Sequence, residues 1–147
     1  QILGYVALAM VLGATIGFER EQANKPAGLR THMLVAGAAA LLVTLGDIVV
    51  ARFDVTLGRE LVQSDPIRII GSVIRCVSFL GDGTIILDRG NNQVDGLTTA
   101  ASLMFDAALG VCVALSRAML AMGLTLLVLA ILRGVGLARR WLEGRRE

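Results

Sequence analysis

Apolar residues fill long stretches of this chain, and charged residues interrupt them at only a few places. Residues 2–17, 33–46, 97–105 and 118–132 contain no Asp, Glu, Lys or Arg. Because a helix needs about 20 mostly apolar residues to cross the hydrocarbon core of a bilayer, these stretches indicate membrane-spanning helices. The pattern predicts about five such spans, at residues 2–18, 33–51, 67–87, 97–115 and 118–137.

The segments between these helices carry turn-forming residues, in the strings NKPAG, QSDP and DRGNNQVDG. Asp65 before Pro66 is typical of a helix start. Only Ser116–Arg117 separates the last two helices, so one long bent helix, and four spans in total, is the alternative. We therefore expect an all-α, polytopic transmembrane bundle over residues 1–137 and a short basic tail over residues 138–147.

The composition argues against an ordinary soluble domain. Hydrophobic residues make up 55% of the 147 residues and charged residues only 18%, whereas about a quarter of the residues in a soluble domain are charged. A soluble bundle of this length could not bury so many apolar faces inside itself. Cys76 and Cys112 lie in apolar segments without metal-ligand spacing, so we expect inert buried thiols and no cofactor.

Basic residues are concentrated in alternate connecting segments. The first loop, the third loop and the tail hold nine of them, whereas the opposite segments hold four: Arg52, Arg59, Arg68 and Arg117. Because cytoplasmic loops are enriched in Lys and Arg, this predicts the N-terminus outside and the C-terminus in the cytoplasm.

Three of the charged residues inside the predicted helices stand out: Arg75, Asp82 and Asp106. Arg75 and Asp82 are seven residues apart and share one helix face, about 10.5 Å apart along the axis. Asp106 lies near the middle of the fourth helix, where a charge costs about 2.5–3.5 kcal/mol and needs a partner or water. If the third and fourth helices form an antiparallel hairpin, Arg75 and Asp106 lie at similar depth, and we predict an ion pair between them. Asp82 is then a candidate cation or proton site, unless Arg89 neutralises it.

Five strings, taken in order, resemble the membrane domain of the MgtC/SapB family: GFERE, KPAGLRTHMLV, DPIRI, FLGDGTII and GLTTAAS. They cover most of residues 10–110, and KPAGLRTH is the most specific of them. The matching candidate residues are Glu19, Arg20, Glu21, Lys25, Pro26, Gly28, Arg30, Thr31, His32, Asp65, Arg68, Gly81, Gly83, Thr98 and Thr99. This chain departs from the family pattern at Cys76, Ser78 and Asp82, and Arg75 and Asp106 are also unusual there.

The resemblance implies a multi-pass protein of the bacterial inner membrane with a role in adaptation to low magnesium and in survival inside host cells (virulence). It implies that some members restrain the proton-translocating ATP synthase. The family often adds a small cytoplasmic domain, which we do not expect here because the chain ends at RRWLEGRRE. The expected partners are the lipid bilayer, another membrane complex such as ATP synthase, and copies of the chain, but no nucleic acid.

The resemblance also changes the interpretation of the first connecting segment. A plain loop would explain its turn at Pro26 and Gly28 and its head-group contacts. We prefer a polar cluster at the cytoplasmic mouth of the bundle, with Arg30 paired to Glu19 or Glu21 and with His32 as a group that gains and loses a proton.

Two functions remain open from the sequence. The preferred one is a non-enzymatic regulator that contacts another membrane complex. The alternative is a cation (Mg2+) or proton transporter that uses Asp82, Asp106 and the first-loop carboxylates. An enzyme is not expected, because a single histidine gives no metal-ligand set and no nucleophile–base arrangement can be placed by spacing.

Overall fold

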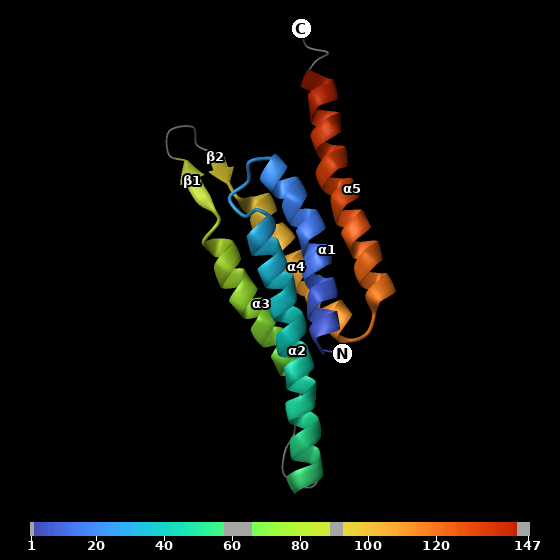
Figure 1. Cartoon of the computed structure of the whole chain (residues 1–147). Helices are drawn as coiled ribbons and strands as arrows, with labels where there is room; N and C mark the ends of the chain where they lie inside the picture. The colour runs from blue at the N-terminus through green and yellow to red at the C-terminus, as the bar shows by residue number, and fades with distance from the viewer. Residues whose placement is uncertain (1, 58–65, 89–92, 144–147) are drawn as a thin grey trace.

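The computed structural model describes the backbone of residues 2–57, 66–88 and 93–143, and the side chains of residues 2–52, 67–85 and 96–134. Its elements, in chain order, are α1 (Ile2–Gln22), α2 (Leu29–Leu57), α3 (Pro66–Asp82), β1 (Ile86–Asp88), β2 (Gln93–Asp95), α4 (Leu97–Ala114) and α5 (Ala118–Glu143) (Figure 1). The all-α prediction is confirmed. Proline stands at the first position of α3, as expected, and Asp65 lies outside the described residues.

The structure adds a small antiparallel hairpin that the sequence pattern did not predict. Strands β1 and β2 pair with Ile86 opposite Asp95, and they lie between α3 and α4. Gly96 then turns the chain into α4 with a φ of 94°, a left-handed conformation that favours glycine. The hairpin therefore forms the connection between two antiparallel helices.

The last two helices are separate, so the bent-helix alternative is not observed. α4 ends at Ala114, and Ser116 takes a left-handed φ of 58°. The amide of Leu115 donates to the carbonyl oxygen of Val111, and the amide of Arg117 donates to that of Cys112. α5 then begins at Ala118 and runs to Glu143, past residue 137, where the last span was expected to end.

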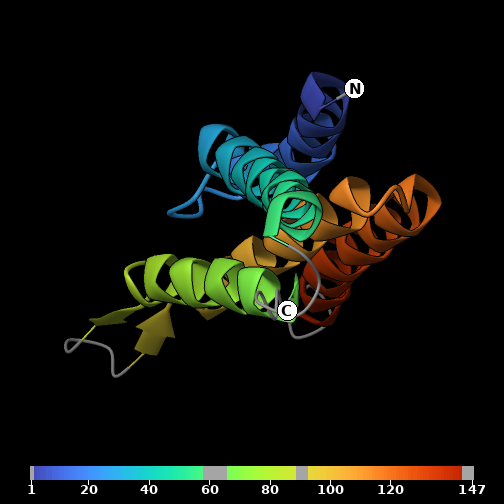
Figure 2. The ribbon, with the colours of Figure 1, turned by 90° about the horizontal axis from the view of Figure 1, so that it is seen from below.

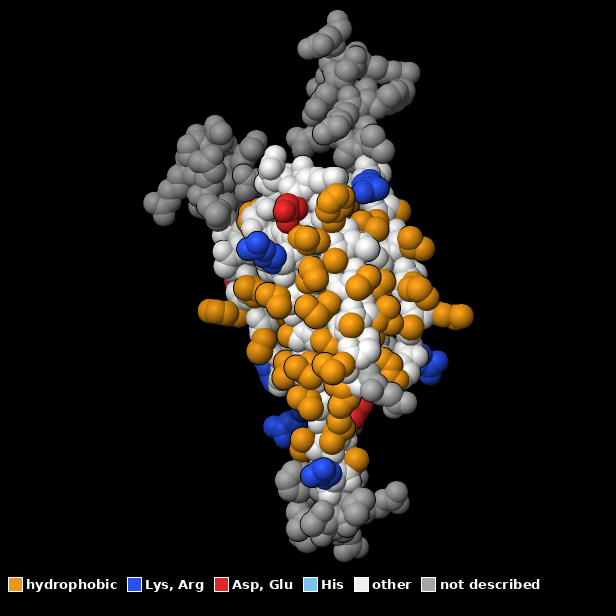
Figure 3. All heavy atoms as spheres, in the orientation of Figure 1, with side chains coloured by type: hydrophobic (Ala, Val, Ile, Leu, Met, Phe, Trp, Pro, Cys, Tyr) orange, Lys and Arg blue, Asp and Glu red, His pale blue; other side chains and the backbone are white. Residues whose placement is uncertain are grey.

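Within the described residues, three helices are long and apolar enough to cross a membrane: Ile2–Gln22, Leu29–Arg52 and Leu97–Ala114. The apolar part of α5, Ala118–Gly134, is slightly shorter. α3 has 17 residues and carries Arg68, Arg75 and Asp82. Hydrophobic side chains form a broad band across the middle of the molecule, with most charged groups of that face above or below it (Figure 3). The fold is therefore a helical membrane bundle.

The helices pack around α2 and α4, which run in the same direction side by side, as Figures 1 and 2 show. α1 contacts both of them, α3 packs on their other side, and α5 contacts α4 and α1. The α1–α2 loop, the hairpin and the end of α5 lie at one end of the bundle (Figure 1). The start of α1 and the α4–α5 turn lie at the other end.

Candidate functional site

The interior of the bundle holds a polar pair that links α2 to α4. His32, in the first turns of α2, and Asp106, in the middle of α4, are both 0% exposed. A hydrogen bond joins His32 Nδ1 and Asp106 Oδ2. Because buried charges are costly unless they are paired, this contact provides what the carboxylate needs at that depth.

Small residues on α1 make room for this pair. A Cβ atom built on Gly17 would lie 2.8 Å from His32 Cβ, and one on Gly13 would lie 2.7 Å from the carbonyl oxygen of His32. Both distances are shorter than side chains tolerate. The GATIG string of α1 therefore lets its backbone approach the turn of α2 that carries the histidine.

Three buried side-chain atoms have no hydrogen-bond partner among the described residues: His32 Nε2, Asp106 Oδ1 and Thr99 Oγ1. Most buried polar atoms in proteins are paired, so such atoms point to a function or to a further ligand. Nδ1 and Oδ2 share one hydrogen bond, while Nε2 and Oδ1 remain available to a further hydrogen-bonding partner. The interior of the bundle therefore contains a candidate binding group.

The end of α1 holds a second, separate set of polar contacts. Glu19 and Arg20 are buried and form an ion pair with each other. The carboxylate of Glu21 accepts a hydrogen bond from the amide of Leu29 at 2.8 Å and so caps the start of α2. A Cβ atom on Gly28 would lie 2.9 Å from that carboxylate, so a larger residue there would displace the Glu21 side chain.

Two predicted ion pairs are therefore wrong. Arg30 is exposed, while Glu19 pairs with Arg20 and Glu21 caps α2. Asp106 bonds to His32 instead of Arg75, because it points from α4 towards α2. Arg75 lies on the exposed side of α3, where it donates to Ser72 Oγ at 3.1 Å.

The exposed side of α3 carries a regular row of mostly polar residues, which we call the outer stripe. Its members are Arg68, Ser72, Arg75, Phe79 and Asp82, all exposed, and their spacing alternates between four and three residues. Val73 and Val77 on the opposite side are buried in the core. Arg68, Arg75 and Asp82 were singled out from the sequence, and Phe79 opens the FLGDGTII string, but Ser72 was not singled out, although the spacing would have revealed it.

Arg75 lies level with the middle of the apolar part of α2. α3 runs antiparallel to α2, since a Cβ atom on Gly46 would touch Ile69, while Leu80 lies near Thr31 and Leu34. Val73 and Val77 share a core cluster with Val35, Ala39 and Val43. A guanidinium at this depth in a bilayer costs about 2.5–3.5 kcal/mol if it faces lipid alone.

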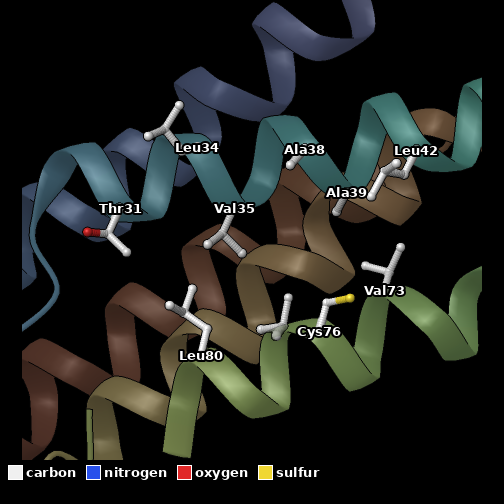
Figure 4. A pocket seen from close by; sticks show the side chains of 10 residues that line it. Thr31, Leu34, Val35, Ala38, Ala39, Leu42, Val73, Cys76 and Leu80 are labelled. Carbon is white, nitrogen blue, oxygen red and sulfur yellow. The ribbon is translucent and has the colours of Figure 1, made fainter. Parts of the chain in front are cut away.

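An apolar groove of 350 Å³ lies between α2 and α3, on the side of α3 away from the outer stripe. Residues from Thr31 to Leu42 line one wall, and residues from Val73 to Leu80 line the other (Figure 4). Cys76, expected to be buried, is exposed on the groove side of α3, whereas Cys112 is half-buried.

The remaining candidates are dispersed. Lys25, Pro26, Gly83 and Thr98 are exposed at the hairpin end of the bundle, whereas Gly81 packs against Ala100. Among the residues that the structure describes, no three His, Cys, Asp or Glu side chains are grouped as a metal site.

Known proteins resemble this chain over most of its length. An uncharacterized protein of Haemophilus influenzae is 34% identical over 146 residues, which are 99% of this chain and 60% of that protein. Protein SapB of Bacillus subtilis is 36% identical over 75% of this chain and 46% of its own length. Protein MgtC of Brucella abortus is 41% identical over 72% of this chain and 39% of its own length.

The chain thus spans about half the length of the curated relatives it matches. No solved structure matches it significantly. A profile of the MgtC family matches residues 6–141, which include all the helices that carry the buried pair and the outer stripe. The resemblance found in the sequence is confirmed, and the chain belongs to the MgtC family.

Proposed function

We propose that this chain is a non-enzymatic regulator that acts by contacting another membrane complex. It would work in the bacterial inner membrane, with its N-terminus outside and its C-terminus in the cytoplasm, in adaptation to low magnesium and survival inside host cells. The proton-translocating ATP synthase is the candidate complex, and contact would restrain it.

The observation that supports this role best is the outer stripe of α3. Two arginines and a serine are exposed on a helix whose other side is packed among apolar residues of a membrane bundle. Polar side chains at such a depth normally face protein or water rather than lipid. A second membrane protein against the stripe would satisfy them.

A specific observation favours transport as the second candidate. The buried pair of His32 and Asp106 has unpaired atoms inside the bundle, and ionisable side chains within a membrane bundle often mark proton or cation pathways. YhiD of Escherichia coli K12, 37% identical over 112 residues, carries a name that marks it as a candidate magnesium transporter.

One reconstitution experiment separates the two candidates. The regulator should slow ATP-driven proton pumping in inverted membrane vesicles, yet leave Mg2+ and proton flux unchanged in liposomes that contain it alone. Flux in those liposomes that Asp82→Asn or Asp106→Asn abolishes, in protein that remains monodisperse, would favour transport. Unchanged pumping would contradict the regulatory proposal.

A further inference from the structure

The outer stripe has the geometry of a seam between two helices. Residues spaced alternately by four and three lie in one row along a helix, and such a row packs against a neighbouring helix in supercoiled pairs. Phe79, which lies between Arg75 and Asp82 in this row, is 83% exposed. None of the other described helices covers this row, so the structure leaves a whole helix-length seam open.

The charge on this seam indicates which chemical group a partner would present to it. Arg75 uses one nitrogen to donate to Ser72 Oγ, and a guanidinium has five N–H donors in a fixed fork. The remaining donors suit a carboxylate, which a guanidinium can bind through two parallel hydrogen bonds. Since Arg75 lies level with the middle of α2, a matching carboxylate would also lie deep in the bilayer.

A second copy of this chain fits the seam poorly. Two copies inserted with the same orientation would place their α3 helices parallel about a twofold axis. Arg75 would then face Arg75 and Arg68 would face Arg68, and such like-charge contacts are unfavourable. The charge of the stripe therefore favours a different protein.

We propose that the outer stripe binds a transmembrane helix of another protein, and that Arg75 pairs with a carboxylate carried within the apolar span of that helix. The inference rests on the proposed function, because it names the chemistry by which a regulator of this kind would recognise its complex. Phe79 and Ser72 pack against the partner helix above and below the ion pair.

Photocrosslinking in native membranes tests this directly. A benzoylphenylalanine at position 79 of the full chain should capture a membrane helix that contains Asp or Glu, identified by peptide mass spectrometry. Arg75→Gln should lower the crosslinking yield about tenfold or more, because the partner carboxylate would be left buried without a positively charged side chain to pair with. Arg75→Lys should lower the yield less than Arg75→Gln does, since lysine keeps the positive charge but lacks the forked N–H donors of the guanidinium.

Two controls isolate the seam. The same crosslinker at Leu126 of α5, which is 68% exposed, should not capture that helix. Ile74→Ala, beside Arg75 but off the stripe, should leave the yield at position 79 unchanged.

Arg75→Glu should abolish capture, and replacing the partner's carboxylate with arginine should restore it. Such rescue would establish the pair.

Four results would overturn the inference: capture of lipid only, capture of a second copy only, a captured helix without a carboxylate, or a yield that Arg75→Gln leaves unchanged. The pumping assay separates this outcome from a failure of the proposed function. Slowed pumping that survives Arg75→Gln would show regulation through another surface. Capture by the seam with unaltered pumping would sustain the helix contact and refute the role at ATP synthase.

Discussion

At the scale of single residues, His32 and Asp106 matter because neither can reach water. Each side chain is 0% exposed, and each has one hydrogen-bonding atom satisfied by the other. Removing one member of a buried pair leaves the other without compensation, whereas replacing both with apolar residues is often tolerated. The pair should therefore behave as one unit.

His32→Leu is expected to lower the free energy of unfolding by about 3–5 kcal/mol, because it strands the buried carboxylate of Asp106. The double variant with Asp106→Leu should recover much of that loss. Thermal unfolding in detergent micelles measures both, with Thr98→Ala, an exposed position on α4, as the matched control. A double variant no more stable than His32→Leu would show that the two side chains are not coupled.

At the scale of elements, glycines set how closely the helices approach. Gly13 and Gly17 bring α1 against α2, and Gly110 brings α4 against α2, where an added Cβ would lie 2.3 Å from the carbonyl oxygen of Ala36. Lipid gives no hydrophobic drive for helix association, so such close contacts contribute much of the packing energy. The helices that hold the buried pair depend on them.

Gly110→Ala should therefore destabilise the bundle by about 1–3 kcal/mol, the usual range for an overpacked site. Gly123→Ala on α5 is the matched control, because a Cβ there meets nothing within 4 Å. That variant should be neutral or slightly stabilising, since alanine favours a helix. Equal melting temperatures for the two variants in detergent would contradict the observed contact between α2 and α4.

The sequence predicted the helices well and their contacts poorly. Charge-free stretches located four of the five helices, because length and hydropathy decide whether a segment can span a bilayer. The third was placed between turn-forming strings, although it carries Arg68, Arg75 and Asp82. The same pattern gives the depth of a residue but not its direction around the helix. Arg75 and Asp106 were therefore paired by depth alone, although the apolar positions Val73 and Val77 turn α3 so that Arg75 faces away from the core.

The partner of Asp106 was harder to find, because His32 is 74 residues away and was placed in a polar cluster at the cytoplasmic mouth, before the start of the predicted second span. The helix α2 begins at Leu29, four residues before the predicted start, and so draws the histidine into the bundle. The hairpin was missed because each strand has only three residues. Segments that short carry too little alternation to be recognised.

At the scale of the whole molecule, the order of the helices determines which of the connecting loops lie on the same side of the membrane. Lys25 lies at the end of the bundle that holds the α1–α2 loop, and Arg117 lies in the α4–α5 turn at the other end (Figure 1). In a chain freed of Cys76 and Cys112, an impermeant maleimide should label Arg117→Cys on intact cells. It should label Lys25→Cys only after the cells are opened. Labelling of both from one side would contradict the orientation.

The central claim is that α3 lies within the bilayer, with the outer stripe facing away from the core of the bundle. Ile74, beside Arg75, is 43% exposed, and Leu41, at about the same level on α2, is 38% exposed. The most direct test is the depth of a nitroxide attached at each position in liposomes, measured from collisions with oxygen and with a polar nickel complex. Labels at Ile74→Cys and Leu41→Cys should lie at the same depth near the bilayer centre, well below labels at Lys25→Cys and Arg117→Cys. A label at position 74 found among the lipid head groups would contradict the account.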